Sequence, residues 1–367
     1  MEPVTITEIR ETFPEDVRQL HARIVQIISY RKGIIPASAR HIIQNVVADG
    51  SNWPPGWFAE ETEEESTFWV QDEVQTDKGQ NMNESNVSFA ARKQQRAQQQ
   101  FTSLRRIQRD AEECLRRGCS EATWNVKVYA PLLELAVRDR RAVFNEPVTT
   151  AYIASQWLPC VKGGGPVAIA ATTSTAGGTE AGVGESETTA HPQGTSSAAV
   201  AGKMIDFALV LNLDPPEGFE PLAGPMQQLL DTQPLPLGYI NQSLYAPLKY
   251  SPIGVSVSVE AEPDSTAARG RLRLGVWTAA WHRRISELIP PGSKITTLPL
   301  VLVEESNWEL YFACDEGREI QMVGPMQIGS TDDMLSSYTL LAVLRELVAW
   351  VDTQFREWVF TTLLAVD

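Results

Sequence analysis

The sequence has few cysteines and no long uninterrupted run of apolar residues. It contains only four cysteines among 367 residues. None of them forms the C-x-x-C spacing of a metal or redox site, which indicates reduced thiols in an intracellular protein, cytoplasmic or nuclear. The first residues lack a basic start followed by an apolar run, so we expect no secretory signal. Without an apolar run of ~18 residues we expect no transmembrane helix and no membrane partner.

Positive charge is also scarce. The chain has 31 Lys and Arg against 46 Asp and Glu, for a formal net charge of −15. Nucleic-acid binding draws its affinity from clustered Lys and Arg, so this total disfavours a nucleic-acid partner without forbidding a local basic groove. One concentration of basic side chains does occur, at 92–117 on a predicted helix. Its basic side chains either contact phosphate or form an ordinary solvated face.

Apolar spacing and turn residues predict alternating helices and strands. We expect helices at 14–30, 37–48, 86–117, 120–139, 266–288 and 333–364, and strands at 147–155, 203–212, 252–262 and 318–328 with a hairpin over 298–315. Residues 163–202 are Gly, Ala, Ser and Thr almost throughout, which predicts a disordered low-complexity insertion. The last helix is expected to be a packing helix, with a protein interface as the alternative.

Three carboxylates stand at the ends of two apolar strands. Asp206 lies in KMIDFALVL, and Glu260 and Glu262 end the segment PIGVSVSVEAE. Because strand residues alternate faces, both glutamates share a face with Gly254, roughly 6–7 Å from each other. Neighbouring strands would bring Asp206 and Glu260 together. Magnesium often takes one or two carboxylates and activates an attacking water. Solvated acids at strand ends are the alternative that this spacing leaves open.

Several segments in the same order resemble the fungal proteins that have a PD-(D/E)XK nuclease-like domain. They are KGIIP at 32–36, GCSEATWNVKVYAPLLELA at 118–136, KMIDFALVL at 203–211, NQSLYAPLKYSPIGVSVSVEAE at 241–262, RLRLGVWTAAWHRR at 271–284 and IGSTDDMLSSYTLLAVLRELVAWV at 328–351. The resemblance implies an α/β (α+β) fold, with a mixed central sheet flanked by helices, an N-terminal helical extension and a C-terminal helix. It divides the chain into a helical region at 1–119 packed on a nuclease-like core at 120–367.

The same resemblance implies a catalytic set. The family's helix glutamate falls on Glu121, its strand aspartate on Asp206 and its next acid on Glu260, with Glu262 where a lysine is expected. Asp206 and Glu260 would then hold Mg²⁺, with Mn²⁺ as a substitute. A register shifted by two residues puts the family's acid on Ser258 and its lysine on Glu260, and strand alternation does not separate the two registers. Either way the lysine is absent, and a glutamate there acts as a base or a further ligand.

A family position on the following helix, usually glutamine, falls on Arg271 or Arg273. A cation there contacts phosphate or a substrate carboxylate, or it pairs with Glu260 or Glu262. We expect the pairing.

Three functions remain open. In the first, the chain is a magnesium-dependent nuclease that has Glu in place of the catalytic Lys, and Arg273 contacts phosphate. Alternatively, it is a nuclease-derived fold that acts on or binds a small molecule in fungal secondary-metabolite biosynthesis, since a fold does not fix its chemistry. The third alternative is a non-catalytic interaction protein.

Overall fold

The computed structural model describes residues 4–7, 13–59, 82–158, 204–213, 222–234, 237–261 and 266–364. Of residues 6–7 and 82–90 only the backbone is described. The predicted insertion at 163–202 and the predicted site residue Glu262 lie outside these ranges.

Seven strands form one mixed sheet in the order β1-β7-β6-β5-β4-β3-β2. The strands are β1 Val4–Thr7, β2 Val143–Pro147, β3 Phe207–Leu211, β4 Ile253–Glu260, β5 Leu298–Glu304, β6 Asn307–Asp315 and β7 Ile320–Ser330. The β1–β7 and β4–β5 pairs are parallel, and the other pairs are antiparallel. This mixed sheet flanked by helices confirms the predicted fold class.

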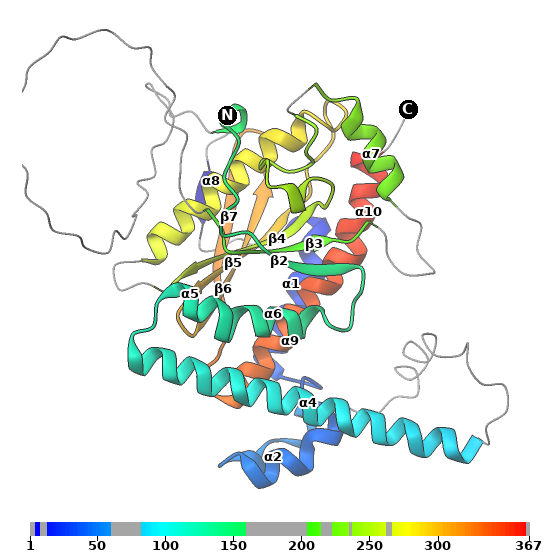
Figure 1. Ribbon diagram of the computed structural model, residues 1–367, viewed down its shortest axis with the longest axis vertical. Helices are drawn as coiled ribbons and strands as arrows, with labels where there is room; N and C mark the ends of the chain where they lie inside the picture. The colour runs from blue at the N-terminus through cyan, green and yellow to red at the C-terminus, as the bar shows by residue number, and fades with distance from the viewer. Residues whose placement is uncertain are drawn as a thin grey trace, which may run out of the picture.

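Helices cover both faces of the sheet (Figure 1). On one face lies α8 (Ala267–Ser286), where a Cβ at Gly275 would lie 3.6 Å from the sulfur of Met322 in β7. On the other lies α1 (Glu15–Tyr30), preceded by Phe13, whose ring lies 5.3 Å from that of Phe312 in β6. Met322 pairs with Ala313, the neighbour of Phe312, so the two side chains point to opposite faces. The core therefore has two apolar layers separated by the sheet.

The strands that carry the carboxylates are central, and β4 is buried along its whole length. Between β3 and β4 the pairing passes from Leu209–Val255 to Val210–Ile253, which leaves Gly254 as an extra residue, a β-bulge. A Cβ at Gly254 would meet Val351 of the C-terminal helix. The bulge therefore breaks the simple alternation that the sequence predicts, and Gly254 does not share the face of Glu260.

The segment before β2 is one continuous helix with a π-helical stretch in its middle. It consists of α5 (Glu121–Trp124), η4 (Asn125–Tyr129) and α6 (Ala130–Val137), close to the predicted limits of 120–139. A π-helical turn is rare and often occurs at functional sites, because its extra residue changes the direction of neighbouring side chains. This helix supplies side chains to the site described below.

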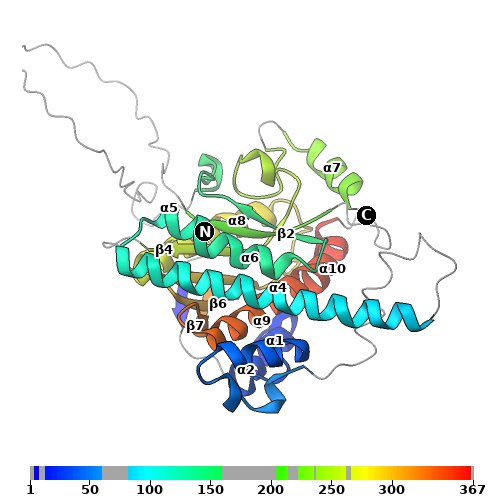
Figure 2. The same cartoon turned by 60° about the horizontal axis from the view of Figure 1, so that its bottom comes forward.

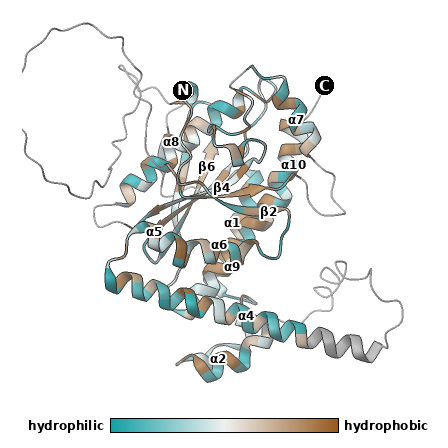
Figure 3. Cartoon of the chain, in the orientation of Figure 1, coloured by the Kyte–Doolittle hydropathy of each residue, from teal (hydrophilic) through white to brown (hydrophobic). Residues whose placement is uncertain are grey.

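The long helix α4 (Met82–Arg117) lies across α6 and α9 at the periphery of the molecule (Figure 2). Its buried side is apolar and consists mainly of Ala97, Phe101, Leu104, Ile107 and Ala111. Its other side is mostly hydrophilic (Figure 3). Beyond it lie η1 (Ala37–Ala39) and α2 (Arg40–Val46), which confirm the helix predicted at 37–48. The other short helices are η2 Gly50–Asn52, η3 Pro55–Trp57, η5 Ser155–Trp157 and η6 Ala246–Leu248.

The C-terminal helix consists of α9 (Met334–Trp350), η7 (Val351–Phe355), α10 (Arg356–Trp358) and η8 (Val359–Leu363). Met334–Leu363 is long and apolar enough to cross a membrane, the one such helix in the described part of the chain. Arg345 and Glu346 interrupt this helix, so it is not the uninterrupted apolar run of ~18 residues that the sequence lacks, and it is weak evidence for a membrane span. Moreover, 67% of its most apolar stretch is buried inside the fold, where it packs on α1, α6 and β7. This burial agrees with the predicted role of a packing helix.

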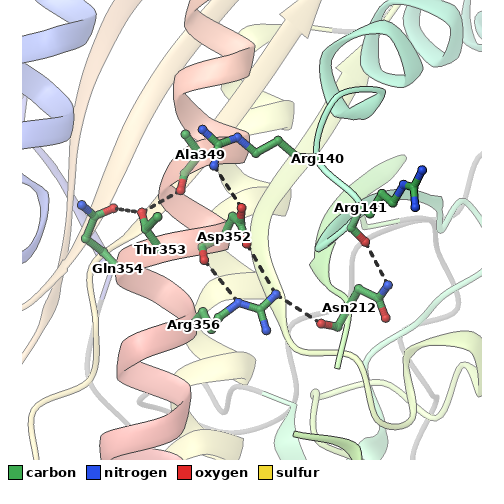
Figure 4. Close-up of polar contacts among 8 residues, drawn as sticks. All are labelled: Arg140, Arg141, Asn212, Ala349, Asp352, Thr353, Gln354 and Arg356. Atoms are coloured by element: carbon green, nitrogen blue, oxygen red, sulfur yellow. Dashed lines mark hydrogen bonds and ion pairs between the residues drawn. The ribbon is translucent and has the colours of Figure 1, made fainter. Parts of the chain in front are cut away.

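A charged cluster ties this helix to the edge of the sheet (Figure 4). Asp352 accepts a hydrogen bond from Arg140 at 3.0 Å and is 3.5 Å from Nη2 of Arg356. Arg356 also donates to the backbone oxygen of Asn212, and Asn212 donates to that of Arg141 at 2.9 Å. These contacts hold η7 against the α6–β2 turn, so we interpret this cluster as structural.

The local structure differs from the prediction in three places: one predicted strand is wrong, and two elements were not predicted. The strand predicted at 147–155 is wrong, because β2 ends at Pro147 and the following residues form turns with one isolated bridge from Ile153 to Ser243. Residues 143–147 form the strand instead, because they pair with β3. Neither β1 nor the helix α7 (Ala223–Asp231) was predicted.

Candidate functional site

Asp206 is fully buried and directly precedes β3. Its backbone N–H donates to the oxygen of Val257 at 2.8 Å, which places it beside the end of β4. Its carboxylate accepts two hydrogen bonds: Oδ2 from the N–H of Val259 at 2.8 Å, and Oδ1 from Nδ2 of Asn125 at 3.2 Å. The predicted meeting of the two carboxylate-bearing strands is therefore confirmed, and Asp206 is already held by donors from the protein.

Glu260 is the last residue of β4 and is only 3% exposed. Its Oε1 accepts a hydrogen bond of 2.9 Å from Nη1 of Arg273, which is also buried. The expected pairing of an arginine with Glu260 is therefore confirmed, and Arg273 is the partner. A charge-assisted contact between two buried side chains is strong once formed, because neither charge is solvated.

The close approach of α8 to β4 depends on a glycine. A Cβ at Gly270 would lie 3.0 Å from Cγ of Glu260 and would also press on Leu302 of β5. Gly270 lies one turn before Arg273 on the same helix. The absence of a side chain at this position lets the helix approach near enough for Arg273 to reach Glu260.

The helix over 121–137 also contributes to the site, because its Asn125 contacts Asp206. Asn125 and Tyr129 are four residues apart, and Tyr129 donates to the backbone oxygen of Glu305 at 2.8 Å. Burial raises the pKa of Tyr129, and the negative charges of Asp206, Glu305 and Glu121 raise it further. Glu121, the predicted helix glutamate, thus lies near this cluster, but Asn125 is the helix residue that contacts Asp206.

Further acids line this end of the sheet. Glu304 is in register with Glu260 across the parallel β4–β5 pair. Burial raises the pKa of Glu304, Glu309 raises it further, and Arg271 acts in the opposite direction. Burial and a hydrogen bond to Glu309 raise the pKa of Tyr311 to about 12, and Arg271 again opposes the shift. Arg271 and Arg273 therefore interact with different acids.

Three residues of this region carry a buried polar atom without a partner among the described residues: Ser258 in β4, Asn125, which contacts Asp206, and Arg273, which contacts Glu260. The atoms are Oγ of Ser258, Oδ1 of Asn125 and Nε of Arg273. Ser258 is fully buried and follows Val257, which pairs with Phe207, the residue next to Asp206. Buried polar groups in folded proteins are almost always hydrogen-bonded, so these atoms indicate a position that water or a ligand completes.

Sequence reasoning did not identify Asn125, Tyr129 or Ser258 as site residues. The signal for the first two was present, since Glu121, Asn125 and Tyr129 follow at steps of four along a helix. Ser258 appeared only as the alternative register for the family's acid. The pairing of β3 with β4, which brings this end of β4 beside Asp206, cannot be read from one strand alone.

The basic residues of 92–117 lie on α4, mostly exposed to solvent. Two of its arginines pair within the helix: Arg117 with Glu113 at 2.7 Å, and Arg106 with Asp110 at 3.5 Å. A cleft of about 670 Å³ runs between this helix and Arg138, lined by Gln95, Gln98, Gln99, Thr102 and Ser103. None of the predicted catalytic residues lines it, so it is not a groove beside Asp206.

Comparison with known proteins identifies the class. The family model described as the PD-(D/E)XK nuclease superfamily matches residues 70–356. The chain therefore belongs to the PD-(D/E)XK nuclease superfamily. No curated protein and no solved structure matches it significantly. The match begins within the region that the sequence assigns to an N-terminal extension, so the superfamily domain includes α4.

PD-(D/E)XK nucleases typically use divalent metals, and the two expected ligands here are Asp206 and Glu260. Magnesium needs accessible oxygens in near-octahedral geometry. In the described ranges, however, no group of three or more His, Cys, Asp or Glu side chains could hold a metal ion. Glu260 carries the guanidinium of Arg273, and both oxygens of Asp206 accept protein hydrogen bonds. This arrangement does not fit a preformed magnesium site.

Proposed function

We propose that this chain is a nuclease-derived protein that binds a small polar molecule at the Asp206–Glu260 site and does not hydrolyse phosphodiesters there with magnesium. The contact between Arg273 and Glu260 carries the proposal. It puts a protein cation on the carboxylate that the family pattern assigns to the metal.

The energy of this ion pair opposes metal binding. A metal at Glu260 would have to displace Arg273, which is 7% exposed and would lose its carboxylate. Removing one partner of a buried ion pair costs about 3–5 kcal/mol. Magnesium held by two carboxylates would have to exceed that cost, and it also gives up its hydration water reluctantly.

Burial and charge favour a small ligand over a nucleic acid. Asp206 and Ser258 are fully buried, so a duplex cannot contact them directly. The net charge of −15 repels a phosphate polymer as a whole. The resemblance to fungal proteins of this kind supports a role in the biosynthesis of a secondary metabolite, where such a ligand would be a substrate or product.

The polar atoms without protein partners support binding directly. A buried donor or acceptor without a partner costs about 1–3 kcal/mol, so a ligand that satisfies Ser258, Asn125 and Arg273 gains that free energy on binding. This arrangement suits a compact molecule with both donors and acceptors.

Thermal unfolding against a panel of nucleosides, nucleotides, amino acids and dicarboxylic acids tests the binding. We expect one chemical class to raise the unfolding temperature of the wild type, because a ligand that binds only the folded state stabilises it. Ser258→Ala should lose this shift. Ser286→Ala is the matched control, since Ser286 is an exposed serine at the far end of α8.

A hydrolysis assay tests the other half of the proposal. Wild type with Mg²⁺ or Mn²⁺ should leave single-stranded and double-stranded DNA and RNA intact. Cleavage that requires the metal and disappears in Asp206→Ala would overturn the proposal. It would support instead the nuclease in which Asp206 and Glu260 bind Mg²⁺ and Glu262 orients the water.

A further inference from the structure

The end of α4 brings two cysteines together through a specific backbone motif. The N–H of Cys119 donates to the oxygen of Cys114 at 3.0 Å, and that of Gly118 donates to the oxygen of Leu115 at 3.3 Å. Gly118 has φ of +59°, in the left-handed region. These nested bonds around a left-handed glycine form a Schellman motif, the common way for a helix to end.

A Schellman motif brings two particular side chains into contact. The residue that follows the left-handed glycine packs against the residue five positions before it, usually through apolar groups. Here those positions are Cys119 and Cys114. Burial raises the pKa of the Cys114 thiol to about 11, and hydrogen bonding to the Cys119 side chain adds to the shift. The two thiols are therefore neighbours, and the turn itself sets their proximity.

The pair has unequal access to solvent and lies beside cations. Cys114 is buried, whereas Cys119 is half-buried and can meet a small oxidant. Positive charge from Lys127 opposes the rise in the pKa of Cys114, and Arg117 interacts with both thiols. A nearby cation favours the thiolate, which is the reactive form. A partly accessible thiol next to a buried one is the arrangement of a reacting and a resolving cysteine.

We propose that Cys114 and Cys119 form a reversible intramolecular disulfide when the protein meets a peroxide. The Cys119 thiolate attacks one oxygen of H₂O₂, the O–O bond breaks, and the departing hydroxide takes a proton to become water. The Cys114 thiol then attacks the sulfur of the resulting sulfenic acid, the S–O bond breaks, and the departing hydroxide takes the thiol proton to leave as a second water. Both thiols are oxidised by one electron each, and the peroxide is reduced to two waters. A dithiol reverses the reaction by exchange.

The position of this pair connects it to the candidate site. Residue 120 follows directly and is the N-cap of α5, which begins with Glu121. The charge of Cys114 also contributes to the raised pKa of Tyr129, so the pair lies close to the residues around Asp206. The disulfide would fix the junction from which Glu121 and Asn125 are positioned.

Peptide mapping of the full-length folded protein after H₂O₂ treatment tests the proposal. Wild type should yield one peptide in which Cys114 and Cys119 are linked, with the loss of two hydrogen atoms, and dithiothreitol should restore both thiols. Cys119→Ser should abolish the link. Gly118→Ala should slow its formation, because a side chain is strained at this φ while both thiols remain. Cys314→Ser is the control and should leave the link unchanged.

Other products would overturn the proposal. These are sulfinic acid on Cys119 with Cys114 still free, a disulfide between two chains, or oxidation of the buried Cys314 before either residue of the pair. Circular dichroism of each variant before oxidation shows whether it is folded. If Cys119→Ser is not folded, blocking of Cys119 by iodoacetamide in folded wild type replaces it and should likewise prevent the link.

Discussion

Arg273 and Glu260 are both buried, and each depends on the other for its electrostatic stabilisation. In a nuclease of this superfamily a metal would neutralise the acid. Here Arg273 of the following helix neutralises Glu260, so the protein itself supplies both charges of the site. The behaviour of the site therefore depends on one ion pair more than on the total number of acids nearby.

Arg273→Met should destabilise the protein by about 3–5 kcal/mol, because it leaves the buried charge of Glu260 without a partner. Chemical denaturation measures this change. The double variant Arg273→Met with Glu260→Gln should recover much of the loss, because no buried charge remains. Arg283→Met, at an exposed position of the same helix, is the control. Equal losses in Arg273→Met and Arg283→Met would contradict the role given to the ion pair.

His282 predicts a pH dependence of stability. It is 4% exposed, and burial lowers its pKa from 6.5 to about 4, while the charge of Asp315 acts in the opposite direction. The unfolded chain therefore binds a proton at a higher pH than the folded chain does. Stability from this group is complete above pH 6.5 and is lost as the pH falls from 6.5 toward 4. The loss is on the order of 3 kcal/mol at 1.36 kcal/mol per pKa unit.

Urea unfolding of wild type and His282→Gln at about pH 7 and about pH 4.5 checks this prediction. The variant should lose less stability over this range than the wild type does. His41→Gln makes the same change at an exposed histidine and should keep the wild-type pH dependence. An identical acid response in His282→Gln would show that other groups cause the loss.

At the scale of elements, the fold near the site was largely predictable. Apolar alternation predicted β3 and β4, and helical spacing predicted the helix that carries Asn125. The bulge at Gly254 and the strand β2 were not predictable, because both depend on pairing with β3. The residues after Pro147 have strand-forming side chains and were predicted as a strand, yet long-range pairing selected the residues before it.

The site was predictable only in part, because sequence patterns show local features but not contacts between distant elements. Asp206, Glu260 and Arg273 could be found from family spacing and from charge. The contacts of Asn125 and Val259 with Asp206 could not, because they join elements far apart in sequence. The parallel pairing of β1 with β7 shows the same limit, since it joins opposite ends of the chain.

The packing of α8 on the sheet can be tested at Gly270. Gly270→Ala should destabilise the protein by about 1–3 kcal/mol, because the added methyl overpacks the contact with Glu260 and Leu302. Gly224→Ala in α7 is the control, because a Cβ there has nothing within 4 Å. Thermal unfolding measures both. A neutral Gly270→Ala would contradict the close approach that brings Arg273 to Glu260.

On the scale of the whole molecule, the superfamily domain and the net negative charge favour different functions. The domain belongs to a nuclease superfamily, whereas the net charge of −15 disfavours a polyanionic substrate. The simplest account that satisfies both observations is a fold that was retained while its metal chemistry was replaced.

Calorimetric titration of Mg²⁺, and separately of Mn²⁺, into the wild-type protein tests this account most directly. The internal ion pair and the engaged oxygens of Asp206 predict no saturable binding of either metal at millimolar concentration. Saturable one-site binding that Asp206→Ala abolishes would contradict the account and return the site to magnesium-dependent hydrolysis.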